Sequence, residues 1–330
     1  MSIRDFARGL ATRPEEFPRR VLEAHDLPAA SLVAADGWSN SVWLTPAHVV
    51  RLSSGRFCGA FAHEVAVAGL LPPAVPHARV LAHGEVGRRE WVIQERVAGR
   101  PLIEVWPGLS RGERRSAVAQ IGAILRALHA VLLPSGFANP WLAAALASGG
   151  RPEDAYHAPP ERHDVLLAAV ERVPGVDQGV LAEAGAFIAE RLHLFATDAQ
   201  VLVHSDAHFA NLLWADGRIT ALLDFEGSRP AARDVELDTL LRFAREPRLY
   251  GDREGRVAVS RDDVRAIPGW LADAYPELFS HPHLPARLAV YDALWHLVQL
   301  LHFPPGSGFP DPWGHLKVLL TTGGPGLSPA

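Results

Sequence analysis

The sequence predicts an α+β protein in which a small N-terminal antiparallel sheet with one helix precedes a larger, mainly helical lobe. Short β-type runs fill the first hundred residues, helical periods dominate after about residue 101, and one short β insertion interrupts them near residue 200. A chain of 330 residues with 48% hydrophobic content can form a substantial core and two lobes. We place the lobes at residues 1–97 and 98–330.

The N-terminal lobe is predicted from five β-type runs and one helical segment. Turn signals at Asp36-Gly37 and Gly87-Arg88 separate two pairs of these runs. The helix covers about Ala60 to Leu71 and ends at Pro72-Pro73, because proline cannot continue a helix. The five runs are Ser31 to Ala34, Ser41 to Thr45, His48 to Leu52, Arg79 to Glu85 and Trp91 to Val97.

The C-terminal lobe begins after a connector, Ala98 to Pro101, and opens with a capped helix. Ser110 and Glu113 form a capping box, and apolar residues then recur at spacings of three and four as far as Leu132. One face of this helix is therefore expected to be buried. Further helical patterns run from about Glu161 to Val173, Asp177 to Ala196, Asp234 to Arg245, Arg261 to Tyr275 and Leu284 to Leu301.

A small β insertion lies between two of these helical patterns. Its strands are predicted at Gln200 to Val203, Leu212 to Trp214 and Arg218 to Leu223, and Asp216-Gly217 is a typical hairpin turn. The most informative polar residues of the chain lie around this insertion.

Composition excludes several kinds of partner and site. A net charge of -5 and a pI near 6.3 give no general attraction to nucleic acid or an anionic membrane, so we expect neither. Cys58 is the only cysteine, which excludes an intramolecular disulfide and a cysteine-based zinc site. Neither a secretory leader within Met1 to Arg20 nor an apolar run of about 18 residues is found, so we expect a cytoplasmic location.

The residues around the β insertion predict phosphoryl-transfer chemistry. Such a site must neutralise phosphate charge and align an acceptor hydroxyl. Asp206 follows a strand and is placed to receive or orient the hydroxyl proton, with His204 as a supporting residue that binds nearby backbone or Asp224. Asn211 and Asp224 offer oxygen atoms of the kind that Mg²⁺ prefers.

This segment resembles the catalytic loop and metal-binding segment of the aminoglycoside phosphotransferase family, small-molecule kinases with a protein-kinase-like fold. The family pattern is His, any residue, Asp, four residues and Asn, then an apolar strand ending in Asp, any residue, and Asp or Glu. His204, Asp206, Asn211, Asp224 and Glu226 match in type and order. The resemblance weakens before about Ser31 and after about Leu301.

The resemblance implies ATP and Mg²⁺ as cofactors, with GTP open as an alternative donor, and a small hydroxylated acceptor. It assigns nucleotide binding to the first lobe, and catalysis with acceptor binding to the second. Ser39 and Asn40 lie in the turn that covers the phosphates in the family, and Glu95 and Val97 lie in the segment that meets the adenine edge. Glu226 would hold a second metal ion or hydrogen-bond the loop.

One position departs from the kinase pattern. Protein kinases place a lysine on the third strand, where it pairs with a glutamate of the next helix and with the phosphates. This chain has Arg51 there, with Glu64 as the matching acid, and its only lysine is Lys317. Arginine binds phosphate through a planar fork that differs in reach from lysine, so nucleotide affinity or choice could differ.

Two other functions stay open at this level. A metal-dependent hydrolase could use His204, Asp206, His208 and Asp224 as ligands, although His208 also fits a packing role. Alternatively, the missing lysine suggests a nucleotide-binding sensor without turnover.

The acceptor and the oligomeric state are not identified. Asp234, Glu236 and Asp238 follow the metal segment, but Arg229 and Arg233 lie close enough in sequence to neutralise them. The sequence therefore gives no strongly anionic pocket for a polycation. A later cluster on one predicted helix also bears on the acceptor, with core packing as its alternative role: Tyr291, Asp292, Trp295, His296 and Gln299.

Overall fold

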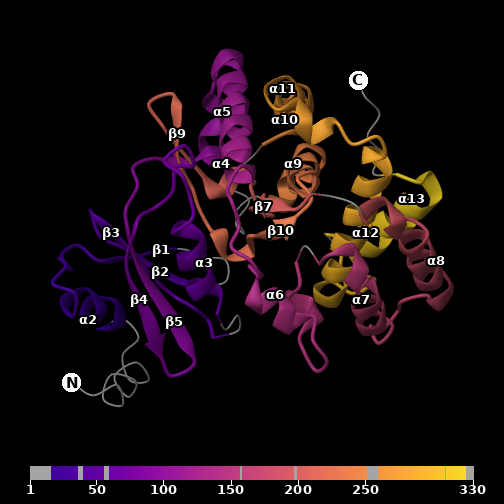
Figure 1. Ribbon diagram of the computed structural model, residues 1–330, viewed down its shortest axis with the longest axis horizontal. Helices are drawn as coiled ribbons and strands as arrows, with labels where there is room; N and C mark the ends of the chain where they lie inside the picture. Colours follow the sequence, from indigo (N-terminus) through magenta and orange to yellow (C-terminus); the bar gives the residue numbers. More distant parts are fainter. Residues whose placement is uncertain are drawn as a thin grey trace.

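A computed structural model describes residues 16–35, 40–55, 59–156, 158–196, 199–250, 259–308 and 310–324. A small sheet with two helices forms one end, and the helices of the larger part form the other (Figure 1). The predicted fold class is confirmed, whereas the boundary at residues 97 and 98 stays a prediction.

The N-terminal sheet has five antiparallel strands in the order β1-β2-β3-β5-β4. Its strands lie within two residues of the predicted bounds at their starts and ends, and helix α3 ends earlier, at Ala68. The side chains of β3 alternate, and the buried Val50 and Leu52 belong to the apolar core on one face of the sheet. The strands are β1 (Val33–Ala35), β2 (Ser41–Leu44), β3 (His48–Leu52), β4 (Val80–Val86) and β5 (Arg89–Glu95), and α3 is Ala60–Ala68.

The expectation of a single helix in this lobe is wrong, because α2 (Phe17–Glu23) packs on the sheet. Phe17, Val21 and Leu22 are buried against strand residues such as Val50. The helix has seven residues, too few to be stable alone, so tertiary burial rather than local pattern accounts for it.

The C-terminal part contains the capped helix and most of the other predicted helices. Ser110 and Glu113 make both bonds of the capping box of α5. The expected single helix from Arg261 to Tyr275 is wrong, because Pro268 near the start of α11 separates two shorter helices. The α-helices are α4 (Leu102–Val105), α5 (Arg111–His129), α6 (Pro140–Ala145), α7 (His163–Val170), α8 (Gln178–Ala189), α9 (Val235–Arg245), α10 (Arg261–Val264), α11 (Ile267–Ala274), α12 (Leu284–His302) and α13 (Pro312–Thr322).

Two small antiparallel sheets carry the β insertion. Strand β7 (Val201–Val203) pairs with β10 (Arg229–Ala231), and β6 (Arg100–Pro101) pairs with the hairpin of β8 (Leu212–Ala215) and β9 (Arg218–Leu222). The connector is thus bonded to the hairpin. Gly99 lies there at φ +138°, and a Cβ at this position would come within 2.9 Å of Thr220 Oγ1.

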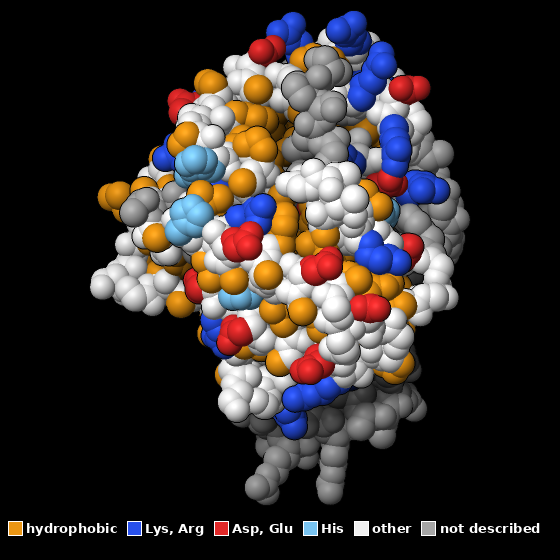
Figure 2. All heavy atoms as spheres, turned by 90° about the vertical axis from the view of Figure 1, so that its right-hand side faces the viewer, with side chains coloured by type: hydrophobic (Ala, Val, Ile, Leu, Met, Phe, Trp, Pro, Cys, Tyr) orange, Lys and Arg blue, Asp and Glu red, His pale blue; other side chains and the backbone are white. Residues whose placement is uncertain are grey.

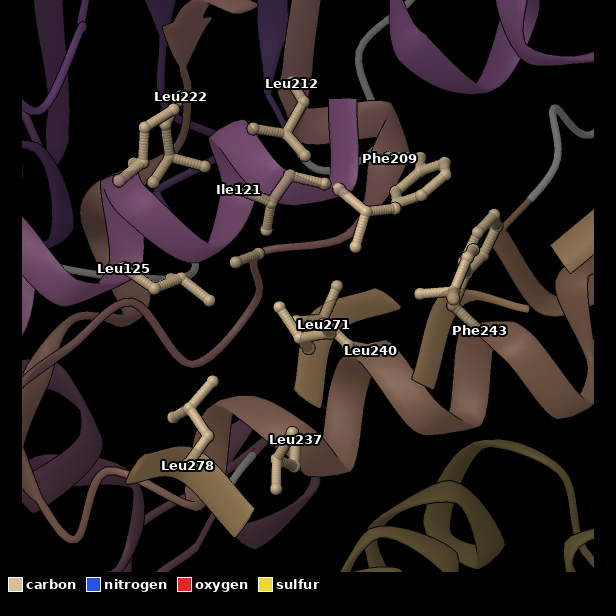
Figure 3. Packing of buried hydrophobic residues seen from close by; sticks show 14 of the residues in the cluster. Ile121, Leu125, Phe209, Leu212, Leu222, Leu237, Leu240, Phe243, Leu271 and Leu278 are labelled. Carbon is tan, nitrogen blue, oxygen red and sulfur yellow. The ribbon is translucent and has the colours of Figure 1, made fainter. Parts of the chain in front are cut away.

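The main core anchors the segment between β7 and β8. Phe209 packs between helices, with its ring 4.5 Å from that of Phe243 on α9 and 4.6 Å from that of Trp106. Figure 3 shows Phe209 among Ile121 of α5 and the apolar residues of α9. Burying such a side chain stabilises the fold by about 1.5–3 kcal/mol. The polar loop is therefore built on a fixed base.

The surface carries mixed charge. On the face that includes the C-terminal helices, acidic and basic side chains are interspersed rather than separated by sign (Figure 2). Within the described ranges, no helix combines the length and hydropathy needed to cross a membrane.

Candidate active site

The loop after β7 is held by His204, whose imidazole is completely buried. Its Nε2 donates to the carbonyl of Leu223 at 2.8 Å, and its Nδ1 accepts from the N–H of Asp206 at 3.2 Å. These two bonds assign the proton to Nε2. His204 thereby joins Asp206 to the residue directly before Asp224.

Helix α9 fixes the same loop from behind through Glu236. The buried Glu236 carboxylate accepts the N–H groups of His204 and Ser205, and Thr239 Oγ1 donates to the Ser205 carbonyl at 2.9 Å. Ser205 has φ +72°, a conformation that costs a non-glycine residue of order 1 kcal/mol or more. The contacts from α9 offset this cost, so Glu236 anchors the loop in its shape.

Asp206 and Asn211 lie in direct contact. Asn211 Nδ2 donates to Asp206 Oδ2 at 3.1 Å and to the Asp206 carbonyl at 2.9 Å. His208 Nε2 lies 3.4 Å from the same Oδ2, and His208 Nδ1 accepts from the N–H of Ala210. The Asp206 side chain is 39% exposed, so an external hydroxyl can reach it.

The segment after β9 places two carboxylates beside this loop. Asp224 has φ +68°, and the turn Phe225–Gly227 follows it. The Glu226 carbonyl accepts from Asn139 Nδ2 at 2.8 Å and from Trp141 Nε1 at 2.6 Å. Both donors lie at the start of α6, so this helix holds the backbone of Glu226 in place.

Arg51 connects β3 to both α3 and the metal segment. Its Nη1 lies 2.8 Å from both carboxylate oxygens of Glu64, and its Nη2 donates to Asp224 Oδ1 at 2.8 Å. The guanidinium also lies 4.6 Å from the centre of the Phe61 ring. The expected pairing of Arg51 with Glu64 is therefore present, with Asp224 as a further partner.

Glu64, Asp224 and Glu226 form a carboxylate cluster whose oxygen atoms come within 4.8 Å of one another. Burial, followed by repulsion from Asp224, raises the pKa of Glu226 well above its ordinary range. Among the described residues, its Oε2 is buried without a hydrogen-bond partner, with Arg51 Nη2 at 3.8 Å. Three acidic groups around one guanidinium leave an excess of negative charge, and these oxygen ligands fit Mg²⁺. The donor set therefore suits the ion that the sequence predicts.

The other sequence-predicted nucleotide residues are placed less closely. Glu95 ends β5, where its side chain pairs with Arg79 at the surface, and the half-buried Val97 follows. Asn40 directly precedes β2, whereas Ser39 lies outside the described residues. Their roles stay predictions.

The geometry argues against the hydrolase alternative. Both ring nitrogens of His204 are bound to backbone groups, and His208 Nδ1 also binds backbone. A metal ion at His204 would have to break these bonds. In the part of the chain that the structure describes, the acidic and histidine residues close enough to share an ion are those of the carboxylate cluster.

Two of the three acidic residues that follow the metal segment, Asp234 and Asp238, are buried in ion pairs with arginine. Asp234 binds Arg287 of α12 at 2.5 and 2.9 Å, and Asp238 pairs with Arg242 one turn along α9. The printed partners are Arg287 and Arg242 in place of the expected Arg229 and Arg233, and Glu236 accepts backbone N–H groups of the loop instead.

Sequence reasoning missed several supporting residues. The sequence indicates Glu236 only as one of three acids after the metal segment, and it gives no functional signal at Trp141 and Thr239. Asn139 before Pro140 is a typical helix start, and its side chain caps α6 while binding the Glu226 carbonyl. No local pattern signals the other contacts.

Solved structures show which class of fold this is. The aminoglycoside phosphotransferase APH(4)-Ia is 18% identical with a TM-score of 0.61, over 94% of this chain and 99% of that chain. The ADP-bound APH(2'')-Ib is 16% identical with a TM-score of 0.61, over 94% and 98%. The streptomycin–ATP complex of APH(2'')-IIa is 14% identical with a TM-score of 0.59, over 90% and 91%. The fold is therefore protein-kinase-like, of the aminoglycoside kinase type.

Family membership rests on a separate comparison. The model of the phosphotransferase enzyme family matches residues 32–271, which is most of the chain and includes both parts of the site. The chain belongs to this family and is a phosphotransferase of the small-molecule kinase type. A search of curated proteins gave no match.

Proposed function

We propose that the protein transfers the γ-phosphate of ATP to a hydroxyl group of a small molecule in a Mg²⁺-dependent reaction. The observation that carries this proposal is the contact between Asp206 and Asn211 beside the carboxylate cluster. Family membership and the nucleotide complexes of structurally similar proteins support the choice of donor. GTP stays an alternative donor.

Asp206 is the proposed base. Asn211 donates to its Oδ2, and His208 lies beside the same atom, so the carboxylate is held in place to accept the hydrogen of the acceptor hydroxyl. His204 and Glu236 hold the loop, which aligns the carboxylate without a conformational change at the moment of transfer.

The metal and nucleotide residues follow from the same arrangement. Asn211, Asp224 and Glu226 would hold Mg²⁺, which neutralises phosphate charge when bound. Asn211 uses its Nδ2 for Asp206, so its Oδ1 is the end suited to a cation. Arg51 and Glu64 would meet the phosphates, while Ser39, Asn40, Glu95 and Val97 would line the rest of the nucleotide site.

Thermal unfolding with and without nucleotide tests the proposal in its first step. We expect ATP with Mg²⁺ to raise the unfolding temperature by several degrees and ATP with EDTA to raise it much less. ADP release is then measured over amino alcohols, sugars and antibiotics. Stabilisation without release on any acceptor contradicts the enzyme proposal and favours the nucleotide-binding sensor.

A further inference from the structure

Helix α3 begins without a cap of its own. Its N-cap residue, Gly59, has φ +86° and no side chain, and the first turn of the helix contains no acidic residue. The N–H groups of a first helical turn have no partner within the helix and need an acceptor from elsewhere. Because Ala60 and Phe61 are each 1% exposed, water has little access to this turn. The acceptor must therefore come from a neighbouring element.

Glu90 of β5 supplies this acceptor. Its Oε2 accepts from the N–H of Gly59 at 2.8 Å and from that of Phe61 at 3.5 Å, and its Oε1 accepts from the N–H of Ala62 at 2.9 Å. Glu90 is buried, so these charge-assisted bonds are little weakened by water. A carboxylate at this end of a helix also interacts favourably with the helix dipole. Both oxygens of Glu90 thus bind α3.

Glu90 is itself held in the sheet by Ser53, which directly follows β3. The N–H of Glu90 donates to Ser53 Oγ at 2.9 Å, and the Glu90 carbonyl accepts from the N–H of Ser53 at 2.8 Å. This pair joins the end of β3 to the start of β5. The carboxylate therefore fixes α3 relative to the strand that carries Arg51.

The register of the sheet places Arg51 on the same face as Glu90. Arg51 is paired with Val92 of β5. Since alternate residues of a strand lie on the same face, Glu90 and Gln94 flank this pair on the face of Arg51. Gln94 Nε2 donates to Glu64 Oε1 at 3.2 Å. Strand β5 thus contacts α3 at two points, at its start through Glu90 and in its second turn through Gln94.

Both contacts of α3 with Arg51 depend on how the helix is placed. Glu64 holds Nη1 of Arg51 through both carboxylate oxygens, and the Phe61 ring lies 4.6 Å from the guanidinium. Phe61 and Glu64 are three residues apart and so lie on one face of the helix. A rotation or shift of α3 would therefore displace both groups from Arg51 together.

We propose that Glu90 is a positioning residue of the nucleotide site, because its carboxylate sets the placement of α3 and thereby of the Glu64–Arg51 pair. The inference rests on the proposed role of Arg51 and Glu64 at the phosphates. Groups that bind a ligand must be held within about 0.5 Å of their productive geometry. Loss of the Glu90 carboxylate should therefore weaken nucleotide binding even when the protein stays folded.

Calorimetric titration with AMP-PNP and Mg²⁺ tests this role without requiring turnover. Each variant is measured well below its unfolding temperature, so that loss of the fold does not contribute. Glu90→Gln keeps the size of the side chain but removes the charged acceptor, and we expect the dissociation constant to rise by about threefold to tenfold. A smaller rise, with only a lower unfolding temperature, overturns the inference.

A double-variant cycle with Glu64→Gln shows whether Glu90 acts through α3. If it does, Glu90→Gln should weaken binding by less than about twofold in the Glu64→Gln background, because the pair that it positions is already lost. Equal effects in both backgrounds overturn the inference. If Glu90→Gln does not fold, Glu90→Asp replaces it in the cycle. Its shorter side chain should weaken binding by at least about twofold, and unchanged binding overturns the inference.

Two controls separate positioning from stability and from surface charge. Asp177 caps α8, at the other end of the molecule from α3 (Figure 1), by accepting from the N–H groups of Gly179 and Val180. Asp177→Ala should lower the unfolding temperature by about 1–4 °C and leave AMP-PNP binding unchanged. Arg115→Gln, at an exposed ion pair between α5 and α11, should change neither quantity. Binding that Asp177→Ala weakens as much as Glu90→Gln does would reflect stability alone and overturn the inference.

This inference and the proposed function fail on different observations. ADP release with no acceptor of the panel, while AMP-PNP binding still depends on Glu90, counts against the proposed function and supports the positioning role. Phosphate transfer to an acceptor, with AMP-PNP binding that does not depend on Glu90, overturns the inference alone.

Discussion

Two buried glutamates in this site have opposite electrostatic surroundings. Burial alone would raise the pKa of the Glu236 carboxyl, but His129 and, to a smaller extent, the N–H of His204 outweigh it and hold that pKa below its ordinary value. Glu226 faces Asp224 and other acids, and burial with this repulsion raises its pKa. Within the described residues both carboxylates keep one oxygen without a hydrogen bond, but Glu236 Oε1 accepts two N–H groups, whereas Glu226 lies among other acids. An external cation would therefore favour the ionised form of Glu226. Glu236 anchors the loop, and Glu226 is a residue of the proposed metal site.

The largest effect is expected from removing one carboxylate of the cluster that contains Glu226. Asp224→Ala should lower turnover by about a hundredfold to ten-thousandfold, because the carboxylate cluster loses a ligand that stabilises charge during transfer. Steady-state ADP release with saturating acceptor measures it. Asp262→Ala, at a side chain that is 92% exposed, is the matched control. Turnover within about threefold of the unaltered chain would remove Asp224 from the metal site.

Replacing Glu236, which anchors the loop, should affect the stability of the fold instead of turnover. Glu236→Gln should lower the free energy of unfolding at pH 7 by about 1–3 kcal/mol, because two N–H groups lose a charged acceptor. Since the folded pKa of Glu236 is lowered, its contribution is present above the unfolded pKa of about 4.3 and is lost as pH falls through the folded value.

Urea unfolding at several pH values measures this difference. The gap between Glu236→Gln and the unaltered chain should narrow below about pH 4. Glu190→Gln, at an exposed carboxylate after α8, should show neither effect. A gap that is constant from pH 7 to pH 3 would mean that the charge of Glu236 does not hold the loop.

Arg51→Lys tests how tightly the internal cation occupies the carboxylate cluster. A single ammonium cannot hold both oxygens of Glu64 and reach Asp224 as the guanidinium does. Asp224 is then more available to the metal, and the Mg²⁺ concentration for half-maximal rate should fall by about threefold to tenfold. Arg115→Lys serves as control. An increase in the Mg²⁺ concentration for half-maximal rate would show instead that the guanidinium group of Arg51 supports metal binding.

The smallest effect is expected from replacing Glu226, and the change in stability should have the opposite sign to that for Glu236. Because its folded pKa is raised, Glu226 destabilises the fold as pH rises through that value and the buried carboxylate ionises. Glu226→Gln should therefore stabilise the metal-free protein at pH 8 by about 0.5–1 kcal/mol, while weakening the stabilisation by Mg²⁺ with ATP. Thermal unfolding measures both. If Glu226→Gln destabilises the protein in EDTA, the contrast between Glu226 and Glu236 is contradicted.

Sequence reasoning succeeded where the chain acts locally. His204, Asp206 and Asn211 lie within eight residues, and a hairpin brings Asp224 back beside them. The predicted turn of that hairpin is confirmed, with φ +50° at Asp216 and +77° at Gly217. Such features depend on spacing and turn chemistry, which a sequence displays.

The features that sequence reasoning missed depend on distant partners. Glu236 meets the loop N–H groups across 32 positions, and Arg287 reaches Asp234 across 53. Helix α2 and the short strand β10 form because other elements bury or pair with them. A charged residue in a helix pattern looks exposed until its partner is placed, so the ion pair between Asp234 and the distant Arg287 was not predictable.

The central claim is that Asp206 acts on the acceptor while nucleotide binding depends on other residues. The most direct measurement compares turnover and the dissociation constant of AMP-PNP with Mg²⁺ between Asp206→Ala and the unaltered chain. We expect turnover to fall by about a hundredfold to ten-thousandfold and the dissociation constant to stay within about threefold. Unchanged turnover, or a loss explained by weaker nucleotide binding, would contradict the assignment of Asp206 as the base.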